Sequence, residues 1–320
     1  MLAYYLYYNY DNNKDQSLEM SQLSITHYPK EDDAMSYTLD GSIKYDERKF
    51  EESIKLYKKA IEINPKFVDA YNGWAYSLYE LKRYDEAEEV YKKANELDPQ
   101  NAYTYDYWAI MRDDRNKPEE AFKMFEKAFQ LDPNNTEFLS DYGKSLLKYK
   151  KYDEALQMFE KVIEIDSKSS LGYSSLGDYY FEKEDTVEAL EHYKKAISLG
   201  SKDIKNYLHA AKILAEQKNF DEAKKLLTKA MELNSKYYQT YSEMADILTE
   251  QKKYQEAITM YKKSMDLDSS DKELFVTYGK FLEEQKKEKE ALEIYKKALR
   301  QQTGDSVYFR KKISELEIDN

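Results

Sequence analysis

The sequence predicts an all-α protein built from eight tandem helical hairpins, and three observations support this fold class. Glycine and proline number only 8 and 5 in 320 residues, so the chain is poor in the turn residues that a many-stranded fold needs. Asn64-Pro65, Asp98-Pro99 and Asp132-Pro133 recur at intervals of 34 residues. A large residue followed four positions later by a small one recurs at the same interval. A period of this length is typical of stacked helical hairpins.

The 34-residue interval continues without insertion or deletion and predicts eight repeats. They span residues 34–67, 68–101, 102–135, 136–169, 170–203, 204–237, 238–271 and 272–305. Residues 1–33 do not fit the repeat and are expected to be disordered or to form a short helix. Residues 306–320 carry Phe309, Ile313 and Leu316 on one helical face and are expected to form a capping helix for the array.

Repeated residue types predict the two helices of each hairpin. Position 4 of each repeat is large and nearly always aromatic, and position 8 is small. The small residues are Gly41, Ala75, Ala109, Gly143, Gly177, Ala211, Ala245 and Gly279. Because residues four apart share a helix face, the small residue lets a neighbouring helix approach while the large one fills the flank. A second series, such as Ala87, Tyr91 and Ala94, predicts the second helix.

The start of the second helix has its own signals. Asp85, Asp153 and Asp221 follow an aromatic residue at this place and are expected to cap the free N–H groups of the helix. Pro118 marks the same start in the third repeat, since proline is tolerated in the first turn of a helix.

This pattern resembles the tetratricopeptide repeat family, whose signature is a series of aromatic, Leu, Gly/Ala, Tyr, Ala, Phe/Tyr, Ala and Pro positions at these offsets. The resemblance covers residues 34–305. It implies a right-handed superhelix, a solenoid whose concave wall is formed by the first helices through positions 2, 5, 9, 12 and 13 of each repeat. Asp40, Lys44 and Ser53 in the first repeat, and Met111-Arg112 in the third, replace expected apolar residues.

Charge and hydropathy exclude several classes of function. The net charge is -12, so a nucleic-acid partner is not expected, because phosphate binding draws on clustered Lys and Arg. No stretch approaches the roughly 20 apolar residues that span a bilayer, so no membrane insertion is expected. Residues 1–10 lack the features of a signal peptide, which favours the cytoplasm.

Catalytic, cofactor and metal sites are not expected either. The chain has no cysteine, and its histidines, His27, His192 and His209, lack partners at metal-ligand spacing. No glycine-rich phosphate loop or nucleophile motif is present. The sequence therefore predicts a protein that is not an enzyme and needs no cofactor.

The concave positions supply the candidate partner-binding residues. In the first three repeats, six of the fifteen residues at these positions are acidic and none is basic. The candidates are Tyr45, Asn72, Tyr76, Tyr79, Tyr103, Asp106, Ile110, Asp113, Lys144, Lys148, Phe181, Leu208 and Lys212. Aromatic and apolar groups at nominally exposed positions are candidate hot spots for binding, whereas charges at the rim mainly steer the association of the partner. The alternative is that tyrosine simply replaces other surface residues, as in an AT-rich gene.

The resemblance implies a scaffold or adaptor that binds a polypeptide in the concave groove. The acidic and aromatic residues at the concave positions predict an extended segment with basic and apolar residues. One alternative is a chaperone-like or regulatory module that holds a client or secreted substrate. A more distant one is the targeting region of a larger enzyme. Tyr4-Tyr5-Leu6-Tyr7-Tyr8 or the end repeats offer a route to homo-oligomers.

Overall fold

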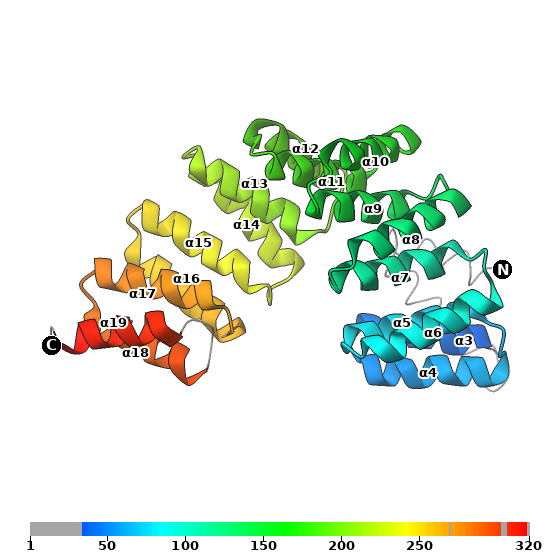
Figure 1. Cartoon of the computed structure of the whole chain (residues 1–320). Helices are drawn as coiled ribbons and strands as arrows, with labels where there is room; N and C mark the ends of the chain where they lie inside the picture. Colours follow the sequence, from blue (N-terminus) through cyan, green and yellow to red (C-terminus); the bar gives the residue numbers. More distant parts are fainter. Residues whose placement is uncertain (1–33, 269, 302–305, 319–320) are drawn as a thin grey trace. The chain divides into compact units, whose positions relative to one another are not determined.

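Helices form all the regular secondary structure of the part of the chain that can be described (Figure 1). The computed structural model describes residues 34–268, 270–301 and 306–318. The predictions for residues 1–33 fall outside the described residues. No described helix is long and apolar enough to cross a membrane.

The chain divides into two compact halves, Met1–Ser167 and Lys168–Asn320. Helix A denotes the first helix of a hairpin and helix B the second. The hairpins of the N-terminal half pair α3 (Ala34–Asp46) with α4 (Phe50–Ile63), α5 (Val68–Glu80) with α6 (Tyr84–Leu97), α7 (Ala102–Asp114) with α8 (Pro118–Leu131), and α9 (Thr136–Lys148) with α10 (Tyr152–Ile165).

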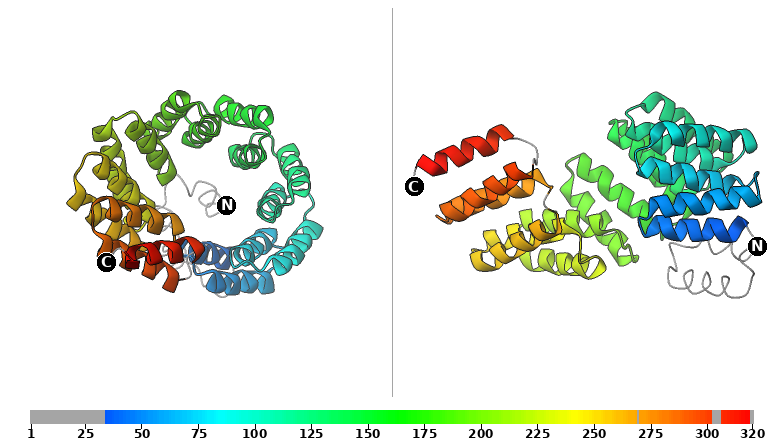
Figure 2. Two further views of the ribbon diagram at one scale, coloured as in Figure 1. Left: turned by 60° about the vertical axis from the view of Figure 1, so that its left-hand side comes forward. Right: turned by 90° about the horizontal axis from the view of Figure 1, so that it is seen from below.

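The C-terminal half continues the same pattern. Its hairpins pair α11 (Ser170–Glu182) with α12 (Thr186–Ser198), α13 (Ile204–Glu216) with α14 (Phe220–Leu233), α15 (Tyr238–Glu250) with α16 (Tyr254–Leu267), and α17 (Lys272–Glu284) with α18 (Glu288–Arg300). A further helix, α19 (Ser306–Ile318), packs along α18 (Figure 2). Phe309 and Leu316 of α19 are buried, so this helix covers the end of the last hairpin as expected.

A backbone feature marks position 15 of every repeat, two residues after the end of helix A. The residue there has a left-handed conformation, with φ between 55° and 62°. These residues are Arg48, Lys82, Asn116, Lys150, Glu184, Lys218, Lys252 and Lys286. At Lys82 the turn lets the Lys82 N–H donate to the Tyr79 carbonyl at 2.8 Å and the Arg83 N–H donate to the Leu78 carbonyl at 2.9 Å. The turn thereby satisfies carbonyl groups that the end of a helix leaves open.

Glycine is the residue that adopts this conformation at the least cost, and none of the eight positions holds one. We therefore expect Lys150→Gly to raise the free energy of unfolding by about 0.5–1 kcal/mol. Lys55→Gly, in the middle of α4, is the control and should lower it by about 1 kcal/mol. Urea unfolding of both variants checks the prediction, and a loss of stability in Lys150→Gly would contradict it.

The N-termini of the B helices contradict one prediction from the sequence. α6 begins at Tyr84, and its N-cap residue, Arg83, makes no side-chain capping bond. Asp85 lies in the first turn instead, as do Asp153 in α10 and Asp221 in α14. The prediction that these aspartates cap helix B was therefore wrong; inside the first turn, their charge is favoured by the helix dipole. Side-chain caps occur on A helices, at Asn101, Asn135, Ser169, Asp203 and Asp271, and on one B helix, α12, at Asp185.

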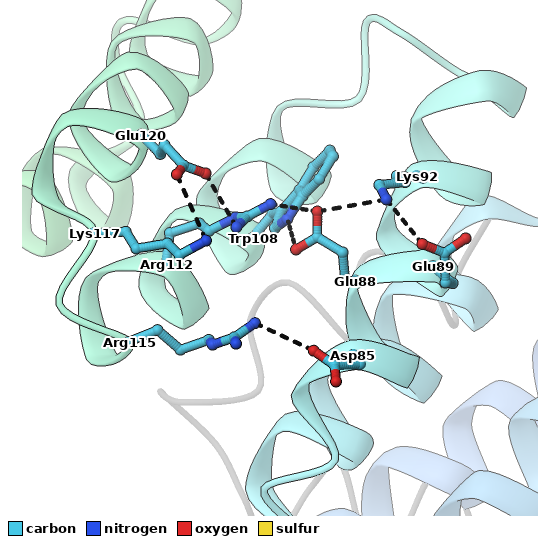
Figure 3. A network of polar contacts seen from close by, with 9 residues as sticks. All are labelled: Asp85, Glu88, Glu89, Lys92, Trp108, Arg112, Arg115, Lys117 and Glu120. Atoms are coloured by element: carbon cyan, nitrogen blue, oxygen red, sulfur yellow. Dashed lines mark hydrogen bonds and ion pairs between the residues drawn. The ribbon is translucent and has the colours of Figure 1, made fainter.

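Arg112 replaces an expected apolar residue and is 9% exposed. Its guanidinium pairs with Glu88 of α6 and, at 3.0 Å, with Glu120 of α8 (Figure 3). Glu88 also accepts a hydrogen bond from Trp108 Nε1 at 3.1 Å. The ion pairs thus connect the second hairpin to the third. Figure 3 also shows Arg115, which reaches the exposed Asp85 at 3.5 Å.

Because Glu88 is largely buried, removal of its partner leaves a desolvated charge. We expect Arg112→Ala to lower the free energy of unfolding by about 3–5 kcal/mol. Arg115→Ala removes an ion pair with an exposed aspartate and should cost about 1 kcal/mol or less. Chemical denaturation of the two variants gives the comparison; equal losses would show that the buried network adds nothing beyond a surface ion pair.

Candidate functional site

A cavity of about 590 Å³ opens among the A helices of the N-terminal half. Its wall draws on α3, α4, α5 and α7 and on the segment that leads into α9. Five tyrosines line it: Tyr45, Tyr57, Tyr76, Tyr103 and Tyr107. Four carboxylate residues also line it: Asp46, Asp69, Asp132 and Glu137. No Lys or Arg of the described residues belongs to this lining, so the cavity is aromatic and acidic.

The tyrosine rings form a continuous series across three A helices. The ring centroids of Tyr45 and Tyr76 are 5.4 Å apart, and those of Tyr76 and Tyr107 are 5.1 Å apart. Tyr107 lies 5.9 Å from Tyr103, which packs edge-on against Phe138 at 4.8 Å. Tilted pairs at these spacings are favourable, so the rings hold each other in place.

A second series of contacts joins position 12 of one repeat to position 13 of the next. The Tyr45 hydroxyl donates to Glu80 Oε1 at 3.0 Å. The Tyr79 hydroxyl donates to Asp114. Asp113 accepts from Lys148 Nζ, at 3.2 Å to its carboxylate and 2.9 Å to its carbonyl. Four candidate residues, Tyr45, Tyr79, Asp113 and Lys148, therefore also hold adjacent A helices together.

The sequence predicted that residues at position 5 of the repeats face solvent, but the candidate residues at this position are buried. Asn72 is 3% exposed and Asp106 is 2% exposed. Asn72 accepts a hydrogen bond from Thr104 Oγ1 at 2.9 Å and donates to Asn101 Oδ1 at 3.3 Å. Leu208, expected to be an exposed apolar group, is buried in the core of the C-terminal half. Asn72 still borders the cavity, but Leu208 is a packing residue.

The other candidates are dispersed. Lys144 is exposed and pairs with Asp141 at 3.2 Å, while Ile110 is half-buried on α7. In the C-terminal half, Lys212 is exposed on α13, and Phe181 stacks on His209 with ring centroids 4.8 Å apart. The cavity brings together only Tyr45, Asn72, Tyr76 and Tyr103 of the predicted set.

Sequence reasoning missed Tyr107, Tyr57 and Asp132 as lining residues. Tyr107 follows Tyr103 by four residues, so their shared helix face could have identified it. Tyr57 belongs to a B helix, and Asp132 belongs to the turn between two repeats. Positions assigned to helix A alone could not have found these two residues.

Burial raises the pKa of several groups in this part of the N-terminal half. It raises the pKa of the Asp106 carboxyl well above its usual range, and the nearby carboxylates of Asp141 and Glu137 raise it further. Burial likewise raises the pKa of Asp69. It raises the pKa of Tyr76 to about 12, so this hydroxyl stays neutral near pH 7.

Polar groups also converge in the C-terminal half, on His209. The Tyr193 hydroxyl is 2.8 Å from His209 Nδ1 and donates to Asp178 Oδ1 at 2.8 Å. No group of three or more His, Cys, Asp or Glu residues in the described ranges is arranged to hold a metal ion.

The raised pKa of Asp106 gives a testable pH dependence. Such a carboxyl contributes stability at low pH that is lost as the pH rises through its folded-state pKa, because the folded chain then keeps a proton that the unfolded chain has released. Asp106→Asn should therefore raise the free energy of unfolding at pH 7 by about 1–3 kcal/mol. The gain should shrink toward pH of about 4, where the unfolded carboxyl is itself protonated.

Urea unfolding across this pH range measures the trend. Asp153→Asn removes one exposed carboxylate from the first turn of α10 and serves as the control. A gain in Asp106→Asn that stayed the same at every pH would contradict the assignment.

Comparison with known proteins gives a consistent family match. A tetratricopeptide repeat model matches residues 44–106, 114–176 and 248–312, which are 191 of the 320 residues. Further tetratricopeptide repeat models match residues 204–269 and 172–202. No match was found among curated protein sequences.

Solved structures share the fold. The APC/C hetero-tetramer Cut9-Hcn1 matches with a TM-score of 0.66 and 16% identity, over 95% of this chain and 60% of that one. Yeast Tom70 matches with a TM-score of 0.65 and 21% identity, over 91% of this chain and 65% of the Tom70 chain. Pseudomonas aeruginosa PilF matches with a TM-score of 0.52 and 20% identity, over 68% of this chain and 97% of the PilF chain. This chain therefore spans less than two thirds of the first two chains.

At these identities the structural similarity shows the fold alone. The sequence models, however, match more than half of the chain, and the A helices begin at the 34-residue intervals of the repeat. The chain belongs to the tetratricopeptide repeat family.

Proposed function

We propose that this protein is an interaction scaffold that binds an extended polypeptide segment with basic and apolar residues. The observation that carries the proposal is the cavity among the A helices, with its five tyrosines, its four carboxylate residues and no lining Lys or Arg. Tetratricopeptide folds are typically non-catalytic scaffolds, and the proposal includes no reaction.

The extent of the lining favours an extended ligand. Most of its residues come from the A helices of four successive repeats, from Leu39 on α3 to Glu137 on α9. A segment that crosses these helices would contact side chains at a regular spacing. Tyrosine supplies large contact area at a low cost in side-chain entropy, which suits such a surface.

The charge of the lining favours a basic ligand. Carboxylates around a partly enclosed cavity attract cations and repel acidic segments, which contributes selectivity as well as association rate. The aromatic rings supply the apolar contacts that desolvated anchor residues need.

Tyr76 contacts Tyr45, Tyr79 and Tyr107, so its removal should open the ring series at its centre. On an array of basic and apolar peptides, we expect Tyr76→Ala to weaken the best binders by about 30-fold, the loss that about 2 kcal/mol at a hot-spot residue produces. Tyr76→Phe keeps the ring and should retain most of the affinity.

Tyr254→Ala is the control, because Tyr254 is 37% exposed on a B helix of the C-terminal half. It should bind the same peptides with unchanged affinity. If native protein retained no peptide, or if Tyr76→Ala and Tyr254→Ala bound every peptide equally well, the proposed function would be wrong.

A further inference from the structure

An uncharged, tyrosine-rich stretch precedes the repeats in the sequence. Residues 1–10 contain five tyrosines, Leu2 and Leu6, and no charged side chain, although 35% of all residues in the chain are charged. Residues 4–10, the tyrosine-rich segment, lie outside the described residues. Aromatic and aliphatic side chains gain free energy when they leave water for an apolar surface. A surface of matching character within reach of this segment is therefore a candidate docking site for it.

The outer face of the first hairpin is polar at the positions that pack against a preceding repeat. In the second repeat, Ala70 at position 3 and Trp74 at position 7 pack in one cluster with Tyr57 of the first repeat. The same two positions of the first repeat hold Ser36 and Asp40. An apolar segment therefore gains little by covering this end of the array.

The aromatic cavity begins on the first helix that follows the tyrosine-rich segment. Leu39, Ser42, Ile43 and Tyr45 of α3 belong to its lining. The connection between the segment and α3, residues 11–33, has 23 residues and can extend over about 75 Å. Four adjacent A helices at spacings of about 8–10 Å span about 30 Å. The connection is therefore long enough to bring the segment to any part of the lining.

The tyrosine-rich segment matches the aromatic part of the lining. The rings of Tyr45, Tyr76 and Tyr107 form the wall, and further tyrosine rings pair favourably with such a surface. The segment brings no side-chain charge to the lining carboxylates, whereas residues 11–33 carry six acidic and two basic side chains and are repelled by them. The segment is thus the part of residues 1–33 that suits the cavity, but it supplies no cation.

We propose that the tyrosine-rich segment docks in the aromatic cavity of its own chain and competes there with the basic partner. The competition rests on the proposed function, whereas the docking does not. A tethered segment is present at an effective concentration on the order of millimolar, so weak contacts are enough to fill the cavity. A basic partner adds the cation that the segment lacks and displaces it.

The docking is tested with pairs of cysteines in the full chain, which has no cysteine of its own. Leu6→Cys with Asn134→Cys places one thiol on the segment and one at the cavity wall. Leu6→Cys with Lys123→Cys is the control, because Lys123 is exposed on helix B of the third repeat. With oxidised glutathione and dilute protein, the cavity pair should form its disulfide about tenfold faster or more, as measured by mass spectrometry after digestion. Equal rates overturn the proposal.

A mixture of two singly substituted chains, Leu6→Cys and Asn134→Cys, distinguishes docking within one chain from docking on a second copy. Docking within one chain predicts that the mixture forms disulfide-linked dimers much more slowly than the doubly substituted chain closes its own disulfide. Dimers that form as fast as the intrachain bond would show exchange between copies and overturn the proposal.

The competition is tested by replacing Tyr4, Tyr5, Tyr7 and Tyr8 together with serine in the full chain. Basic and apolar peptides of the array should then bind about tenfold more tightly, because the cavity is no longer occupied by the segment. Phenylalanine at the same four positions keeps the rings and should leave the affinity unchanged. Thermal unfolding shows that both variants are folded. Unchanged peptide affinity in the serine variant also overturns the proposal.

The cysteine pairs and the peptide array separate this inference from the proposed function. Peptides that bind through Tyr76 with the same affinity in the native chain and in the serine variant would leave the scaffold proposal standing and refute the competition. A cavity pair that closes faster than its control, in a chain that retains no peptide, would support the docking and refute the proposed function.

Discussion

The contact between position 24 on helix B and position 8 on helix A determines how closely each hairpin can pack. A Cβ atom added to Gly41 would lie 2.8 Å from Tyr57 Cε1, and one added to Gly177 would lie 2.6 Å from Tyr193 Cδ1. Those distances are shorter than carbon atoms tolerate, so the ring occupies the space that a larger side chain would need. Repeats with alanine at position 8 bury it completely. Because this contact recurs every 34 residues, the A helices present the same face repeatedly, and the cavity is built from those faces.

The periodicity of the sequence was sufficient to predict the helices but not the residues that form the wall of the cavity. The A helices begin at Ala34, Val68 and each later 34-residue step, because the packing contacts that define them are local and repeated. Asn72 and Asp106 were placed at a solvent-facing position, yet both are buried, since burial there depends on which side chains the neighbouring repeats supply. Tyr57 reaches the cavity from a B helix, where no pattern within helix A could reveal it.

Hydrogen bonding at position 24 explains part of the charge pattern along the A helices. Where this residue is tyrosine, its hydroxyl finds an acceptor on helix A: Tyr193 donates to Asp178 at 2.8 Å, and Tyr261 donates to Asp246. Phe159 and Leu227 have no hydroxyl group and need no such acceptor, and in their repeats position 9 holds a lysine. Carboxylates at position 9 are therefore packing partners, and a count of acidic residues along the face overstates the charge available to a ligand.

The second repeat breaks this rule. Tyr91 is completely buried, but its hydroxyl has no hydrogen-bond partner, and position 9 holds Tyr76 in place of an acceptor such as Ser42 or Asp178. Tyr76 instead joins the ring series that lines the cavity. Asp106, in the next repeat, carries a second unpartnered oxygen, and its charge acts on the pKa of both tyrosines. Local rules of packing and polar satisfaction are commonly relaxed at binding sites, where side chains are retained for their ligand despite a cost in stability. Tyr76, which lines the cavity, stands at the position where other repeats supply the acceptor for the tyrosine of helix B.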